Sequence, residues 1–274
     1  MSAPKLHIST APFLQDAQST PRVMIEVVLA LVPIIAAAIW FFGISALLVL
    51  FAATAGAVAT ERAFTPGRKS LGSLRDGSAL LTGILLALTL PPALPLWMAF
   101  LGGAVAIALG KLIWGGLGQN LFNPALVGRA FLQAAFPTTI TTWSAPDAGF
   151  FHIEPSTFAP PFFRASVDVV TTATPLALSK FEHKVTEMGP LLWGNTAGSL
   201  GETAAALILL AGLWLAFRRI FDWRLPLSTL LSVALFGTVL WLINPATIPN
   251  PGFMLCSGGL LLGAVFMVTD PVTT

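Results

Sequence analysis

The sequence predicts an all-α fold: a polytopic transmembrane helix bundle with an inverted-topology repeat and broken helices. The chain is 55% hydrophobic and only 9% charged, with a mean hydropathy of +0.84, whereas soluble domains average about 25% charged residues. Apolar runs long enough to span a bilayer recur along it. One apolar stretch also recurs near the end of the chain, where its expected direction across the membrane is reversed.

Apolar runs of about 17–25 residues are long enough for a helix to span a bilayer. In chain order, the candidate runs are 23–42, 44–63, 78–90, 96–114, a short piece ending near 136, 198–217, 225–243 and 253–269. The third run is short and stops at Pro91 and Pro92, and a glycine-rich stretch precedes the fifth. We therefore expect seven or eight crossings, some of them broken.

Basic residues in the short connections predict the orientation. The connection 62–75 carries Arg62, Arg68, Lys69 and Arg75, and the connection 218–224 carries Arg218, Arg219 and Arg224. Short loops rich in Lys and Arg stay in the cytoplasm. We therefore expect a cytoplasmic N-terminus (1–22), a first transmembrane half (23–136), a periplasmic segment (137–197) and a second transmembrane half (198–274) that is incomplete at its C-terminal end.

An internal repeat relates the two halves. Residues 78–92, SALLTGILLALTLPP, align with 258–272, GGLLLGAVFMVTDPV, at an offset of 180. The first copy is expected to run outward and the second inward, as in inverted repeats that surround a central site. We therefore expect 23–92 to superpose on 203–272 about an axis in the membrane plane, and the counterpart of 96–136 to follow residue 274.

Several classes of chemistry find no support in the sequence. It contains no Walker loop, no GxGxxG after a strand, no HExxH and no Ser-His-Asp constellation, so soluble-enzyme chemistry is not expected. The histidines, His7, His152 and His183, are scattered, and Cys256 is the single cysteine, so we predict neither a metal site nor a disulfide. A net charge of +2 is too small to indicate a nucleic-acid partner.

Polar residues interrupt the apolar pattern over 111–129, KLIWGGLGQNLFNPALVGR. Polar side chains at membrane depth are tolerated where they are buried in protein or line a cavity, so Asn120 and Asn123 are expected to line a site. The alternative is a structural helix break in which the asparagines satisfy freed backbone carbonyls. Asp270 lies on the same predicted side, where it could cap a helix, accept a hydrogen bond or meet a cation. Two amides and a carboxylate suit an imide-bearing ligand such as an isoalloxazine ring.

A second polar cluster lies in the longest polar segment. The stretch 166–180, SVDVVTTATPLALSK, places three threonines within four positions. Taken alone, such a cluster is typical of a capped turn before Pro175.

Five ordered blocks together resemble a known family. They are DGSALLTGILLALTLPP, GGLGQNLFNPALVGRAFL, DVVTTATPL, GSLGETAAALILLAGLWL and SGGLLLGAVFMVTDPVTT. The chain resembles the RnfD subunits of Rnf electron-transport complexes, which are homologous to the NqrB subunits of sodium-pumping NADH:quinone oxidoreductases. The resemblance implies a multi-pass subunit of the bacterial inner membrane. Such a subunit relays electrons in an ion-translocating ferredoxin:NAD+ oxidoreductase and is coupled to Na+ or H+ transport.

The resemblance also implies a covalent cofactor. In this family the motif D-x-x-[S/T]-G-A-T ends in a threonine that carries FMN through a phosphoester bond. Asp168, Thr171, Ala173 and Thr174 match the motif, and Thr172 replaces its glycine. Thr174 is therefore the expected FMN-bearing residue.

Further expectations follow from the same resemblance. The family binds a second, noncovalent riboflavin at positions that correspond to Asn120, Asn123 and Asp270. The implied partners are the other Rnf subunits, notably the RnfG-type flavin subunit, as well as a flavin transferase and the lipid bilayer. About 22 residues precede the first span, which favours RnfD over an NqrB-like subunit. A rival from another class is a non-redox transporter or channel with inverted repeats, and the flavin motif discriminates between the two classes.

Overall fold

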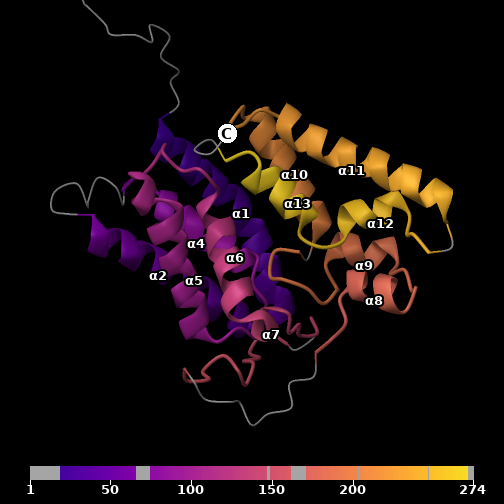
Figure 1. The fold of residues 1–274 in the computed structure, drawn as a ribbon, viewed down its shortest axis with the longest axis horizontal. Helices are drawn as coiled ribbons and strands as arrows, with labels where there is room; N and C mark the ends of the chain where they lie inside the picture. Colours follow the sequence, from indigo (N-terminus) through magenta and orange to yellow (C-terminus); the bar gives the residue numbers. More distant parts are fainter. Residues whose placement is uncertain are drawn as a thin grey trace, which may run out of the picture.

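The structure is a computed structural model that describes residues 19–65, 75–146, 149–161, 171–202, 204–245 and 247–270. Within these ranges the regular secondary structure is helical, with no strand. The first half of the described chain contains α1 (Thr20–Phe42), α2 (Ile44–Phe64), α4 (Ser78–Leu88), α5 (Leu96–Gly110), the 3-10 turn η1 (Leu112–Trp114), α6 (Pro124–Ala135) and α7 (Pro137–Ile140) (Figure 1). The second half contains α8 (Pro175–Phe181), α9 (Met188–Trp193), α10 (Ala205–Phe217), α11 (Arg224–Ile243), α12 (Pro251–Cys256), α13 (Leu260–Leu262) and the π-helical turn η2 (Gly263–Met267).

Four helical segments are long and apolar enough to cross a membrane: Thr20–Phe42, Ile44–Phe64, Leu96–Trp114 and Arg224–Ile243. Two shorter apolar helices, α4 and α10, accompany them. The predicted fold class, a polytopic transmembrane helix bundle, is therefore confirmed.

Glycine lets α2 and α5 pack closely. A Cβ atom added to Gly103 would lie 2.0 Å from the Ala53 carbonyl oxygen, and one added to Gly56 would lie 2.1 Å from that of Phe100. Helices in lipid associate through such small residues because lipid offers no hydrophobic drive to bring them together. The α2–α5 pair is therefore the tightly packed centre of the first half.

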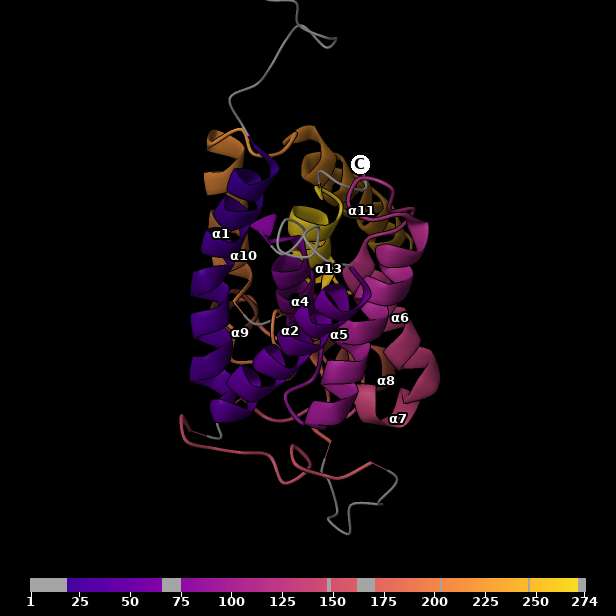
Figure 2. The same cartoon turned by 90° about the vertical axis from the view of Figure 1, so that its left-hand side faces the viewer.

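The first helices of the two halves run in opposite directions. At one end, Arg218 Nη2 lies 2.8 Å from Glu26 Oε1. Near the other end, a Cβ atom on Gly194 would meet both the Phe41 ring, at 2.9 Å, and the Ala204 backbone nitrogen, at 2.6 Å. The end of α10 therefore lies beside the start of α1, and Figure 2 shows the two helices side by side.

The order of helices agrees with the predicted repeat. The starts of α2 and α11 are 180 residues apart, and α10 and α13 begin 185 and 182 residues after α1 and α4. The antiparallel α1 and α10 also have the directions that an inverted repeat requires. Superposition of the two segments stays a prediction.

Two predicted spans have different boundaries in the structure. The run 198–217 does not start as a helix, because the backbone N–H groups of Leu200 and Gly201 donate to the Leu90 and Leu88 carbonyls, at 3.1 and 2.7 Å. The α10 helix therefore begins only at Ala205. The run 253–269 is divided into α12, α13 and η2, with Gly258 at a φ of +69° between the first two. Both breaks lie beside the cavities described below.

Candidate functional site

Asn120, Asn123 and Asp270 line one cavity, which we call the inner cavity. It lies between α1, α4, the start of α6, the end of α10 and η2, beside the basic connection 218–224. The structure thus brings together the three residues that the sequence assigned to a second ligand site, although about 150 residues separate the asparagines from the aspartate along the chain.

Asn123 has a structural role in this cavity. Its Oδ1 accepts a hydrogen bond from the Ala125 backbone N–H at 3.0 Å, and Pro124 occupies the first helical position, so Asn123 is the N-cap of α6. Its Nδ2 donates to Asp270 Oδ2 at 3.3 Å. The Asn123 oxygen therefore satisfies a backbone N–H group at the start of α6. The structural alternative had the asparagines satisfy freed carbonyls, whereas the Asn123 amide nitrogen donates to a carboxylate.

Asn120 is different, because its oxygen is available to a ligand. Gly115 and Gly116, at φ values of +110° and +104°, turn the chain back after η1 toward Asn120. The Asn120 Oδ1 atom is buried and has no hydrogen-bond partner among the described residues. A buried acceptor without a donor costs about 1–3 kcal/mol. A ligand N–H group would therefore be favourable at this position.

The inner cavity fits the edge of a flavin but not the whole ring. An imide edge requires one acceptor for its N–H and donors for its two carbonyls: Asn120 Oδ1 is such an acceptor, and side-chain amide nitrogens are such donors. Its volume is only about 30 Å³, far below the roughly 300–1,000 Å³ of pockets that hold a whole ligand. The lining side chains must move apart before an isoalloxazine ring can enter.

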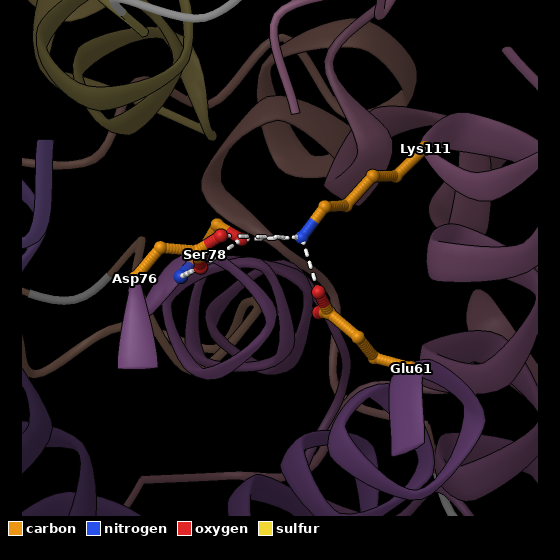
Figure 3. Close-up of polar contacts among 4 residues, drawn as sticks. All are labelled: Glu61, Asp76, Ser78 and Lys111. Atoms are coloured by element: carbon orange, nitrogen blue, oxygen red, sulfur yellow. Dashed lines mark hydrogen bonds and ion pairs between the residues drawn. The ribbon is translucent and has the colours of Figure 1, made fainter. Parts of the chain in front are cut away.

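A buried charged network borders the inner cavity (Figure 3). Lys111 Nζ lies 2.5 Å from Glu61 Oε1, 2.6 Å from Ser78 Oγ and 3.9 Å from Asp76 Oδ2. The Lys111 and Glu61 side chains are 2% and 0% exposed. The ammonium group therefore joins the last turn of α2 to the start of α4 inside the protein.

Lys111 belongs to the polar run of the sequence, but that run does not reveal the partners of this side chain. Glu61 carried a usable signal, because an ionisable residue inside an apolar span is functional or paired by default. The spacing of Glu61, Asp76 and Ser78 along the chain did not predict that they meet.

Thr174 lies in the wall of a second cavity, the outer cavity, which has a volume of about 230 Å³. Pro175 follows it at the first position of α8, and its Oγ1 accepts a hydrogen bond from the Ala177 backbone N–H at 3.2 Å. The threonine is therefore the N-cap of α8, which begins at Pro175. The cluster alone indicated a capped turn before this proline. Figure 2 shows α8 toward the opposite end of the bundle from the start of α1.

The other motif residues have less defined environments. Thr171 and Ala173 are exposed, and the Thr172 backbone N–H donates to the Trp143 carbonyl at 2.9 Å. Asp168 lies outside the described residues. Of the four motif residues that match the family pattern, Thr174 is thus the one that the structure assigns to a cavity wall.

A third cavity, the central cavity, has a volume of about 410 Å³ and shares Arg129 and Glu202 with the outer cavity. Arg129 projects from α6 and donates a hydrogen bond to the Thr89 carbonyl at the end of α4. Glu202 accepts from the Ser199 backbone N–H at 3.3 Å. The two charged side chains therefore lie between the outer and central cavities. No motif in the sequence marked Glu202 as a site residue.

The model of the NQR2, RnfD, RnfE family matches residues 7–274. The chain belongs to this family. The family that the five sequence blocks indicated is therefore confirmed.

Relatives within the NQR2, RnfD, RnfE family cover nearly the whole chain. The D subunit of the ion-translocating oxidoreductase complex of Escherichia coli strain SE11 is 37% identical over 288 residues, which cover 97% of this chain and 82% of the relative. Its counterpart from strain UMN026 is 36% identical with the same coverage. The similarity therefore includes the stretches that form all three cavities.

Proposed function

We propose that this chain is the membrane subunit of an ion-translocating oxidoreductase complex of the Rnf type, in the bacterial inner membrane. Its family and the names of its relatives support this function, and its helices are those of a multi-pass membrane protein. Within the complex the chain relays electrons through FMN bound covalently at Thr174, coupled to Na+ or H+ transport.

The position of Thr174 is the observation that carries the proposal. The hydroxyl caps α8 by accepting a hydrogen bond, so its own hydrogen is not needed for the cap. Replacing that hydrogen with the FMN phosphorus keeps the oxygen in place at the wall of the outer cavity. When bound, the flavin supplies the redox chemistry, and the chain supplies its position and surroundings.

A second, noncovalent flavin is proposed for the inner cavity. Asn120 Oδ1 is the buried acceptor that an imide N–H would satisfy. Asn123 and Asp270 are hydrogen-bonded to each other in the same cavity wall. The small volume of this cavity means that binding is coupled to its opening. Flavins at the inner and outer cavities would suit a relay across the membrane.

The proposed function requires partner proteins. A flavin transferase must attach FMN to Thr174, and the RnfG-type flavin subunit and the other Rnf subunits would exchange electrons with it. An NqrB-like subunit would bind the same flavins in another complex. A non-redox transporter or channel would carry no flavin, so flavin content separates that class from the redox proteins.

The decisive experiment is flavin fluorescence of the denatured chain in a gel, after expression with the flavin transferase. The wild-type band should fluoresce. Thr174→Asn should abolish the fluorescence, because asparagine keeps the N-cap but has no hydroxyl to esterify. Thr171→Val and Thr172→Val are matched controls that should keep the signal.

Two outcomes would contradict this proposal. A fluorescent Thr174→Asn band would place the linkage elsewhere, and a dark wild-type band would leave the chain without a covalent flavin. Thr174→Val is a weaker test, because it also removes the cap of α8, which typically costs about 1 kcal/mol.

A further inference from the structure

Arg129 and Thr174 line the same cavity from different parts of the fold. Arg129 projects from α6, and Thr174 begins α8. Arg129 is the one Lys, Arg or His side chain among the described residues of the outer cavity wall. Any anion that enters this cavity therefore meets this guanidinium group first.

The Arg129 guanidinium has unused hydrogen-bonding capacity. It has five N–H donors, and in the described part of the chain its hydrogen-bond partner is the Thr89 carbonyl. Among the same residues, no carboxylate lies within the 4.0 Å of an ion pair. A planar guanidinium with free donors is the group that proteins prefer for binding phosphate through two hydrogen bonds.

The proposed linkage brings an anion into this cavity. FMN joined to a threonine hydroxyl is a phosphodiester, which keeps a negative charge at neutral pH. Burying such a charge without a partner is strongly unfavourable. Glu202 lies in the same wall and already interacts electrostatically with Arg129. Once the flavin is attached, this guanidinium group must balance both the carboxylate and the phosphate.

We propose that Arg129 is the counter-ion of the FMN phosphate and holds the phosphate inside the outer cavity. This inference rests on the proposed FMN linkage at Thr174. The cavity, at about 230 Å³, is smaller than the roughly 300–1,000 Å³ of whole-ligand pockets. It therefore holds the phosphate and adjoining chain, while the isoalloxazine ring lies beyond it.

Arg129 then connects the flavin to the centre of the bundle. The same side chain lines the central cavity and binds the carbonyl at the end of α4. A test must therefore separate phosphate binding from this capping of α4.

The test is a thermodynamic cycle of melting temperatures in detergent. Arg129→Gln is made both in the FMN-loaded protein and in flavin-free Thr174→Asn, whose α8 cap is retained. If Arg129 binds the phosphate, the substitution should lower the Tm of the loaded protein by about 2–4 °C more than that of the flavin-free protein. Glu202→Gln, the matched control, should leave the Tm of the loaded protein unchanged or raise it.

Equal Tm losses in both backgrounds would show that Arg129 only caps α4, and would overturn the inference while leaving covalent FMN intact. A wild-type chain without covalent flavin would overturn the proposed function and this inference together. If Arg129→Gln does not fold, Arg129→Lys replaces it, because lysine keeps the charge but lacks the planar guanidinium. Its Tm losses in the FMN-loaded and flavin-free proteins are then compared in the same way. A folded Arg129→Gln chain that takes up no FMN, with uptake restored in Arg129→Lys, also supports the counter-ion.

Discussion

Single residues show how this chain tolerates polar groups inside an apolar bundle. The Lys111 ammonium has a carboxylate and a hydroxyl at hydrogen-bonding distance, because an isolated charge cannot be buried without a large cost. Asn120, by contrast, buries an acceptor that no described residue satisfies. Paired groups of the first kind stabilise the fold, and unpaired groups of the second kind are candidates for ligand contacts.

Removing one member of the Lys111–Glu61 pair should strongly destabilise the protein. Breaking a buried ion pair typically costs about 3–5 kcal/mol because the remaining charge is left uncompensated. Lys111→Met and Glu61→Gln should each lower the Tm in detergent, and the double variant should lose less than the sum of the two. Lys184→Met, which breaks an exposed pair with Glu182, should change little. Additive losses would mean that the two side chains are not coupled.

Asn120 should determine occupancy of the inner cavity. Losing a hydrogen bond to a buried ligand group typically costs about 1–3 kcal/mol, so Asn120→Leu should lower noncovalent riboflavin occupancy about tenfold or more. The measurement is flavin released by denaturation, separated from flavin that stays on the chain. The covalent FMN of the same sample is the internal control. Full riboflavin occupancy in Asn120→Leu would move the second flavin to another site.

At the scale of elements, close contacts between helices depend on single glycine residues, which have no side chain. The α2–α5 contact leaves no room for a methyl group at Gly103. In contrast, α11 is 11% buried along its apolar window, whereas α2 is 50% buried. Packing of the first half is therefore tighter than packing of the described second half.

Gly103→Ala should destabilise the protein, because its Cβ would overlap the Ala53 carbonyl. Overpacking of a filled interior typically costs about 1–3 kcal/mol, which should appear as a lower Tm in detergent. Gly189→Ala is the matched control, since a Cβ at Gly189 meets nothing within 4 Å. A Tm equal to that of the control would show that α2 and α5 separate without cost.

At the scale of the whole molecule, the inner, outer and central cavities lie between helices. The inner and outer cavities take residues from both halves, and the central cavity lies between α6, the 199–202 turn and α13. A relay of electrons across the membrane needs its two ends on opposite sides. The distribution of basic residues predicts that the outer cavity faces the periplasm.

Cysteine labelling in intact cells tests this orientation. In a Cys256→Ser background, Lys184→Cys should react with a membrane-impermeant thiol reagent, because Lys184 is exposed and belongs to the predicted periplasmic segment. Asp222→Cys, in the basic connection 218–224, should react only after the cells are opened. The reverse pattern would place Thr174 and its proposed flavin on the cytoplasmic side.

The amino-acid sequence by itself determined the class of this protein. Hydropathy identified the apolar spans, since lipid accepts helices whose backbone groups are satisfied internally. The five blocks indicated the family, and the resemblance assigned Asn120, Asn123 and Asp270 to a second ligand site. These features depend on local composition and short motifs, which a sequence displays directly.

Only the tertiary structure decided how distant residues meet. It paired Lys111 with Glu61 and Ser78 and placed Arg129 and Thr174 in one cavity wall. It also showed that α10 begins only at Ala205, because the preceding N–H groups donate to carbonyls at the end of α4. It further showed that the inner cavity, at about 30 Å³, is far smaller than a pocket that holds a whole ligand. Such contacts depend on how helices from different parts of the chain pack against one another. Periodicity along the sequence carries no information about which distant helices become neighbours.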